Sequence, residues 1–287
     1  MAQAATTGSL ENAQRIIIST ARYTEEHNAP AMNLIEKFTL GKGNKQVTVP
    51  KVGQMSMSDL VDGQDIIDEE EIGMSTVDLT AAEVGAKVIL TDKLVRQSAA
   101  NVFSIIGRQL GDGMARKKDT DVTALYSGFS TDIGSAGRSM SLANVSATVA
   151  YAKGNKFGSQ VYIVQHPFAV WDIANTAVTA STTYPVPAGW SADLLGNFFS
   201  GLRPINGVPI FEDGNITVDS SDDAVGVCAD RSALGVVSSI DTRTERQRDA
   251  SLRATEVVIT ADYGVFELDD SKGVALTLDA ATPATTS

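Results

Sequence analysis

The chain has 287 residues, enough for about two domains or one large mixed domain with a substantial core. Hydrophobic residues make up 43% and charged residues 20% of the chain, which excludes wholesale disorder, a collagen-like repeat and a bundle of membrane-spanning helices. The 23 basic and 35 acidic residues give a net charge of -12, and such a surface argues against a nucleic-acid-binding protein because it repels phosphate.

Cysteine and histidine are scarce. Only Cys228, His27 and His166 occur, so an intrachain disulfide and a cysteine-rich zinc site are excluded. The N-terminus lacks a basic cluster followed by an apolar core, and no stretch reaches about 18 consecutive apolar residues. We therefore expect a soluble protein that is made in the cytoplasm and has no membrane partner.

The N-terminal part of the chain carries short strand signals. Three consecutive isoleucines within residues 15–23 suit either a short helix or a strand. Residues 37–40 and 46–50 show apolar-polar alternation on either side of a Gly/Asn turn at residues 41–44. This pattern predicts a β-hairpin between the two segments.

Residues 52–86 are acidic and contain no Lys or Arg. The acidic side chains are Asp59, Asp62, Asp65, Asp68, Glu69, Glu70, Glu71, Asp78 and Glu83. Apolar-polar alternation flanks them at residues 47–57 and 74–90, which predicts a long two-armed hairpin with a solvated acidic tip. An ordinary charged surface loop is the alternative.

Helical periodicity is strongest between residues 91 and 126. Thr91 is suited to cap the helix start, with Asp92 in the first turn. An unbroken helix of this length would span about 54 Å, whereas Gly107, Gly111 and Gly113 favour a bend or a break. The apolar stripe, at steps of three and four, consists of Val95, Ala99, Val102, Ile106, Leu110 and Met114. The basic residues expected on the exterior are Arg96, Arg108, Arg116, Lys117 and Lys118.

A glycine-rich crossing at residues 128–137 precedes a mixed region. Helices are predicted at residues 141–153 and from His166-Pro167 to residue 174. A loop is expected at residues 178–200, and strands at residues 160–164, 204–211, 224–229 and 233–237. The mixed-charge stretch 241–249 is expected to connect long antiparallel strands, which include residues 255–268 and 273–278.

The motifs of common enzyme classes are missing. Neither a phosphate-binding glycine loop nor a nucleophile elbow with its closing glycine occurs. The acidic groups at residues 68–71 and at Asp219, Asp222 and Asp223 lack the spacing of a calcium loop and are expected to be hydrated.

Two residues remain as candidates for catalysis. Cys228 lies in the apolar run 225–229, where burial would make a thiol inert. His166 precedes Pro167 and is better explained as a polar residue at a helix start. We therefore predict no catalytic, cofactor-binding or metal-binding residues, no cofactor and no enzymatic activity, with a hydrolase that uses Cys228 or His166 as the remaining alternative from another class.

The order of these elements resembles the major capsid proteins of tailed bacteriophages, which have the Hong Kong 97 type fold. The resemblance is carried by the hairpin arms that enter residues 91–94, the helix over residues 95–124, the turn at residues 205–210, and the tail segments 230–235 and 260–268. The resemblance covers nearly the whole chain. It is a match in the order of the elements and in the composition of the segments, without a catalytic motif. It implies an α+β fold with N-arm, extended loop, spine helix, axial domain and peripheral domain.

The resemblance also implies a domain organisation. Residues 1–44 would be the N-terminal arm, residues 45–89 the extended acidic hairpin loop, and residues 90–138 the spine helix and peripheral domain. Residues 139–235 would form the axial domain, and residues 236–287 the peripheral-domain strands and the C-terminal strand.

The implied function is that of a major capsid protein. Its copies would form pentamers and hexamers of an icosahedral virion capsid that encloses double-stranded DNA without binding it specifically, after synthesis in the host bacterial cytoplasm. Separate scaffolding, portal and decoration proteins are expected partners. A cellular encapsulin-like nanocompartment of the same fold is the second interpretation.

An acidic hairpin requires a basic partner surface. We expect Asp68, Glu69, Glu70 and Glu71 of one copy to lie over a basic patch of the next copy and to set its register. One such patch is the exterior of the long helix, and the other is the strand connection with Arg243, Arg246, Arg248 and Arg253.

Overall fold

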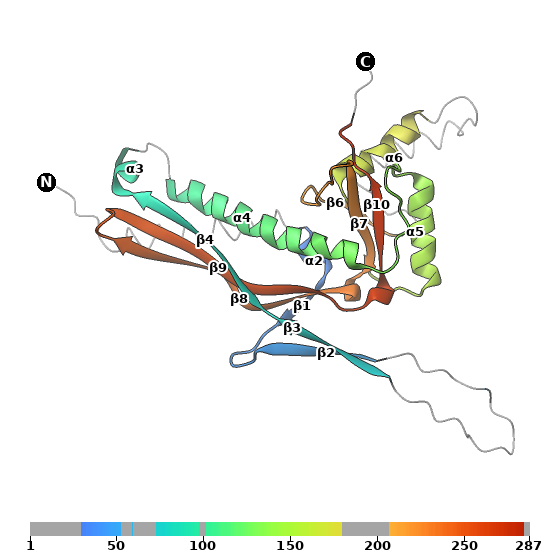
Figure 1. Ribbon diagram of the computed structural model, residues 1–287, viewed down its shortest axis with the longest axis horizontal. Helices are drawn as coiled ribbons and strands as arrows, with labels where there is room; N and C mark the ends of the chain where they lie inside the picture. The colour runs from blue at the N-terminus through green and yellow to red at the C-terminus, as the bar shows by residue number, and fades with distance from the viewer. Residues whose placement is uncertain (1–29, 53–58, 60–72, 98–101, 180–206, 284–287) are drawn as a thin grey trace.

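The computed structural model of the protein describes residues 30–52, 59, 73–97, 102–179 and 207–283. Its elements form two four-stranded sheets and one two-stranded sheet, with a long helix that runs along the first sheet (Figure 1). The architecture is therefore the predicted mixture of helices and strands. Residues 178–179 of the predicted loop are helical, whereas its residues 180–200 and the acidic residues 68–71 lie outside the described part of the chain.

The first sheet is long and mostly antiparallel. Its order is β1 (Glu36–Thr39), β8 (Leu234–Asp249), β9 (Ala254–Glu267) and β4 (Ala82–Thr91). β9 lies in the centre and pairs antiparallel with β8 on one side and with β4 on the other. Its β-branched and aromatic residues alternate between the two faces, which explains why this segment forms a strand.

The predicted pairing of residues 37–40 with 46–50 is wrong. The turn between them forms, since the Asn44 amide donates to the Gly41 carbonyl at 3.1 Å and Gly43 has φ +90°. However, β1 pairs in parallel with β8 and places Phe38 opposite Val237. The buried start of β8 offers β1 an apolar edge that a hairpin partner in the exposed β2 would lack.

The long two-armed hairpin is confirmed in its arms. β2 (Gln46–Val52) pairs antiparallel with β3 (Met74–Thr80), from Gln46 opposite Thr80 to Val52 opposite Met74. β3 continues almost directly into β4, so one extended segment belongs first to the hairpin and then to the first sheet (Figure 1).

The long helix is present and its capping is as predicted. α3 (Asp92–Gln97) begins after Thr91, whose Oγ1 accepts a hydrogen bond from the Leu94 amide at 3.4 Å. α4 (Val102–Ala124) follows, and the 3-10 turn η1 (Leu125–Gly128) ends it.

The expected break at the glycines is wrong, because α4 runs through Gly107, Gly111 and Gly113 without interruption. Gly107 and Gly111 are buried together with Ile106, Leu110 and Met114, so packing of this face offsets the poor helix propensity of glycine. Val95, predicted in the same stripe, is 38% exposed on α3.

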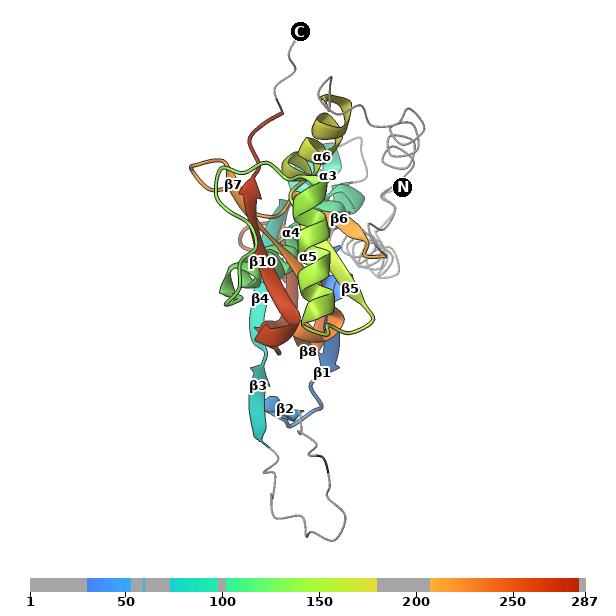
Figure 2. The same ribbon diagram turned by 90° about the vertical axis from the view of Figure 1, so that its right-hand side faces the viewer.

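The second sheet contains the strands predicted for the middle and the end of the chain. Its order is β10 (Gly273–Asp279), β7 (Asp223–Asp230), β5 (Val161–Gln165) and β6 (Ile210–Glu212). α5 (Leu142–Gly154) lies across this sheet, as Figure 2 shows, and α6 (Pro167–Thr179) follows β5. The last strand of the chain therefore joins the sheet of the 139–235 region, while β8 and β9 belong to the first sheet.

The mixed-charge stretch 241–249 is not a connection, contrary to the prediction. It is the second half of β8, which continues to Asp249. Thr242 and Thr244 are buried whereas Arg243 and Glu245 are exposed, so the stretch has the alternation of a strand with one polar face. The turn comes later, where the Asp249 carboxylate accepts hydrogen bonds from the Ser251 and Leu252 amides at 2.8 and 3.1 Å.

A single hydrophobic core connects both sheets and α4. It includes Tyr126 of η1, Ile163 of β5 and Ile259 of β9, each nearly inaccessible to solvent. Among the described helices, none combines the length and the apolar character needed to cross a membrane.

We predict that Leu110→Ala lowers the free energy of unfolding by about 2–5 kcal/mol, because it leaves a cavity where α4 meets the core. Ile105→Ala is the matched control, since Ile105 is 51% exposed on the same helix, and its effect should stay within about 0.5 kcal/mol. Urea denaturation of the unassembled subunit measures both values. Equal losses in the two variants would show that α4 does not bury the face described.

Candidate functional site

The two candidate catalytic side chains have structural roles. Cys228 of β7 is fully buried, and burial raises the pKa of its thiol to about 12. His166 is 8% exposed, and its Nδ1 accepts a hydrogen bond from the Phe168 amide at 3.3 Å, at the start of α6. Burial also lowers the pKa of His166. The thiol is protonated at neutral pH and the imidazole caps a helix, as the sequence indicated.

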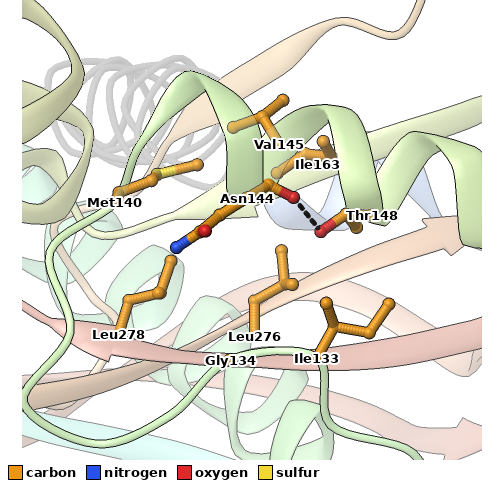
Figure 3. Close-up of a pocket in the computed structure, with 9 residues that line it drawn as sticks. All are labelled: Ile133, Gly134, Met140, Asn144, Val145, Thr148, Ile163, Leu276 and Leu278. Atoms are coloured by element: carbon orange, nitrogen blue, oxygen red, sulfur yellow. Dashed lines mark hydrogen bonds between the residues drawn. The ribbon is translucent and has the colours of Figure 1, made fainter.

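One cavity beside α5 is too small for a substrate. It lies between α5 and β10 and has a volume of about 10 Å³, which is room for about one water molecule. The hydroxyl of Thr148 turns to its own helix and donates to the Asn144 carbonyl at 2.8 Å (Figure 3). The lining is mostly apolar and consists of Ile133, Gly134, Met140, Asn144, Val145, Thr148, Ile163, Leu276 and Leu278.

The acidic residues considered for a cation site stabilise a turn. The Asp219 carboxylate accepts hydrogen bonds from the Ser221 and Asp223 amides at 2.7 and 2.9 Å, and the Asp223 carboxylate accepts one from the Gly137 amide at 2.6 Å. Within the described ranges, no group of three or more His, Cys, Asp or Glu side chains is arranged to hold a metal ion.

The basic residues of the predicted contact already have partners in the same chain. Arg248 makes a two-pronged ion pair with Asp92 at 2.5 and 2.7 Å, and this hydrogen bonding lowers the pKa of Asp92. Arg243 pairs with Glu245 on β8. Arg246 is half-buried, and its side chain also has an interaction within the chain.

The fold combines the two predicted basic patches in an unexpected way. Arg96 of α3 and Arg253 of the β8–β9 turn both lower the pKa of Asp92 through their charge, together with Arg248. We call Arg96, Arg248 and Arg253 the distal basic end. Sequence spacing missed this cluster, because β8 and α3 meet only through the pairing of β9 with both β8 and β4.

Other predicted exterior cations bind their own subunit. Lys117 pairs with Asp121 at 2.6 Å. Lys118 donates to Thr242 Oγ1 at 3.3 Å and lies 5.6 Å from the centre of the Tyr263 ring. Lys118 therefore holds α4 against the first sheet, whereas the pair of Lys117 lies within α4.

The hairpin is tied to its own subunit by one ion pair near the outer end of β2 and by one close backbone approach at the inner end of β3. Lys51 of β2 pairs with Asp269 at 2.5 Å, beyond the end of β9. At Gly264 of β9, an added Cβ atom would come within 2.2 Å of the Thr80 carbonyl oxygen. A glycine at this position therefore lets β3 cross closely over β9.

The arrangement defines a structural protein with surfaces that extend beyond its own core. A model of the phage capsid protein family matches residues 74–277. The chain therefore belongs to the family of phage capsid proteins, and its function is that of a major capsid protein, a component of the virion shell. No curated protein sequence matches it.

The fold agrees with this assignment. The chain is similar to a solved structure from Mycobacterium phage Che8, with 16% identity, a TM-score of 0.69, and coverage of 86% of this chain and 90% of that chain. It is also similar to the capsid of Helicobacter pylori bacteriophage KHP30, with 11% identity, a TM-score of 0.69, and coverage of 86% and 88%. It is likewise similar to the mature capsid of bacteriophage PhiM1, with 16% identity, a TM-score of 0.63, and coverage of 89% of this chain and 88% of that chain. The predicted Hong Kong 97 type capsid fold is confirmed.

We predict that Gly264→Ala lowers the free energy of unfolding by about 1–3 kcal/mol, because the new methyl group collides with the Thr80 carbonyl oxygen. Gly113→Ala is the matched control, since it meets no atom within 4 Å in α4 and should raise stability by about 0.5–1 kcal/mol. Urea denaturation measures both variants. If Gly264→Ala is as stable as the original protein, β3 does not need this close crossing.

Proposed function

We propose that copies of this chain assemble as pentamers and hexamers into a closed icosahedral shell that encloses double-stranded DNA. The observation that carries this proposal is the two-stranded hairpin β2–β3, which has its own sheet and projects beyond the core. An isolated two-stranded hairpin is marginally stable in water, and Met74 at its outer end is 64% exposed. Coverage by a neighbouring copy would stabilise such an arm.

The charge of the chain supports enclosure without specific DNA binding. A net charge of -12 disfavours tight contacts with phosphate, and contents that must leave the shell benefit from a weakly binding wall. Synthesis in the host cytoplasm, the absence of enzymatic activity, and separate scaffolding, portal and decoration proteins belong to this proposal. The family match does not favour a nanocompartment or a hydrolase.

The proposed contact between copies joins the acidic residues Asp68–Glu71 to basic residues of β8. Register places Arg248 opposite Thr255 of β9, and Thr255 opposite Leu90 of β4. The 17 residues of extended chain from Met74 to Leu90 span about 50 Å, in the direction away from the hairpin (Figure 1).

The acidic segment of the same chain is too short to reach Arg248. Residues 53–73 are anchored at both ends, so they reach at most half of their extended length, about 35 Å. A contact of Asp68–Glu71 with Arg248 would therefore have to come from another copy. The charges of Asp92 and Arg248 cancel, so Arg96 and Arg253 give the distal basic end its net positive charge.

We predict that the purified chain, alone or with a companion scaffolding protein, forms closed particles whose mass by light scattering corresponds to many subunits. Electron microscopy should show icosahedral shells. A protein that stays monomeric under all assembly conditions would contradict the proposed function. Particles that form only with the scaffolding protein would support both the shell and the separate partner.

We predict that Glu69→Lys, Glu70→Lys and Glu71→Lys together block or misdirect assembly, because like charges would meet at the inter-subunit contact. Circular dichroism should show that the subunit remains folded, since residues 69–71 lie in the sequence between the hairpin arms β2 and β3 and belong to neither. The matched control changes Glu36, Glu83 and Asp241 to Lys, three exposed residues away from residues 68–71, and alters the net charge equally. Normal particles from the first variant would refute the contact and leave the shell proposal intact.

A further inference from the structure

Two buried carboxyl groups meet where the N-terminal part of the described chain joins α4. Asp119 of α4 is fully buried, and Asp213, directly after β6, is 2% exposed. One oxygen of Asp119 accepts a hydrogen bond from the Ala31 amide at 3.1 Å, and the other accepts one from the Asn215 side-chain amide at 2.8 Å. Asp119 thus contacts the helix α2 (Ala31–Leu34), which packs against α4 (Figure 1).

The second carboxyl group is incompletely satisfied. Asp213 Oδ1 accepts a hydrogen bond from the Asn215 amide at 2.9 Å, whereas Asp213 Oδ2 is buried and has no partner within the described residues. A buried carboxylate oxygen without a donor is costly, and two ionised carboxylates side by side repel each other strongly. Something must neutralise part of this negative charge.

A proton fits the site better than a metal ion. The site has two carboxyl groups, and the Asn215 amide nitrogen donates to Asp119, which leaves few oxygen ligands for Ca²⁺, an ion that takes 6–8 of them. A proton on Asp119 would supply the donor that Asp213 Oδ2 lacks. It would also leave the hydrogen bonds from Ala31 and Asn215 in place.

We propose that Asp119 carries a proton, which it shares with Asp213 Oδ2 as a hydrogen bond, and that this proton acts as a latch, which fastens the chain at Ala31 to α4 and to the turn after β6. Loss of the proton places two negative charges in the buried site and loosens the attachment of α2. The latch belongs to a single subunit and does not depend on assembly into a shell.

The groups around the pair come from several elements. Asp112 and Arg116 of α4, Glu212 of β6 and Asn215 line an open cavity with Asp213. Burial raises the pKa of Tyr126 of η1 well above the usual value, and the charges of both carboxyl groups raise it further. Burial lowers the pKa of His166, which precedes α6, although the charge of Asp213 acts in the opposite direction. Tyr126 therefore stays neutral between pH 6 and 8. His166 is mostly neutral at any pH above the usual pKa of a histidine, because its own pKa is lower.

The pH dependence follows from the pKa of Asp119. Burial and the neighbouring Asp213 carboxyl group raise this pKa from 3.8 to about 7. The closed state therefore binds a proton more tightly than the open state, so its advantage is complete at acidic pH and is lost as the pH rises toward 7. Between pH 6 and 8 the opening equilibrium should increase about tenfold.

Hydrogen exchange of the full-length protein tests the latch at the amide of Ala31. After correction for the intrinsic exchange rate, its protection should fall about tenfold between pH 6 and 8. In Asp119→Asn the fall should be less than about twofold, because the amide is neutral and has a similar shape. Asp213→Asn should behave in the same way. Asp121→Asn is the matched control on α4, since Asp121 binds Lys117 and the Tyr263 hydroxyl, and it should retain the tenfold change.

Two outcomes would overturn the proposal. The first is equal pH dependence in the original protein and in both asparagine variants, which would assign the change to other groups. The second is a stabilisation at pH 8 by added Ca²⁺ that disappears in Asp213→Asn, which would identify a cation site in place of a shared proton. If both asparagine variants fail to fold, a flat protection profile of Ala31 in the original protein between pH 6 and 8 would refute the latch by itself.

Discussion

The antiparallel pairing of β8 with β9 is the interaction on which the rest of this subunit depends. β9 also pairs with β4, so the ladder carries the segment that leads into the hairpin. α4 packs on the same sheet through a buried apolar face and through Lys118, which contacts Thr242 of β8 and Tyr263 of β9. A stiff, elongated body results, to which the hairpin and the second sheet are attached.

The elongated shape has a direct consequence for a capsid protein. A thin closed shell requires subunits that reach past their neighbours, and symmetric contacts repeat the same surface many times. The hairpin leaves the sheet where β3 crosses Gly264, and Lys51, near the outer end of β2, ties the arm to Asp269. The direction of the arm is thus set by the subunit itself, whereas its stability would come from the neighbouring copy that covers it.

Charge is placed on this body with two different consequences. At the distal basic end, the Asp92–Arg248 pair lies on a solvated surface, so the proposed contact between copies would contribute register rather than affinity. Inside the subunit, Asp119 and Asp213 are buried away from water, where a negative charge costs far more free energy than at the surface. Scarce cysteine and histidine therefore do not mean that the chain lacks titratable devices, because buried aspartates can titrate near neutral pH.

Local sequence patterns determined the type of most elements. Periodicity and caps predicted α5, α6, β5, β7, β9, β10, the hairpin arms and the start of the long helix, and their order was sufficient to indicate the capsid fold. Tertiary structure decided what depends on distant partners. β1 joins β8 in place of β2, β8 continues through residues 241–249, α4 is unbroken at its glycines, Arg96 meets Arg248 and Arg253, and Asp119 meets Asp213. The physical reason is that a local pattern fixes backbone conformation and the buried face, whereas partners and pKa values depend on which surfaces meet when the chain is folded.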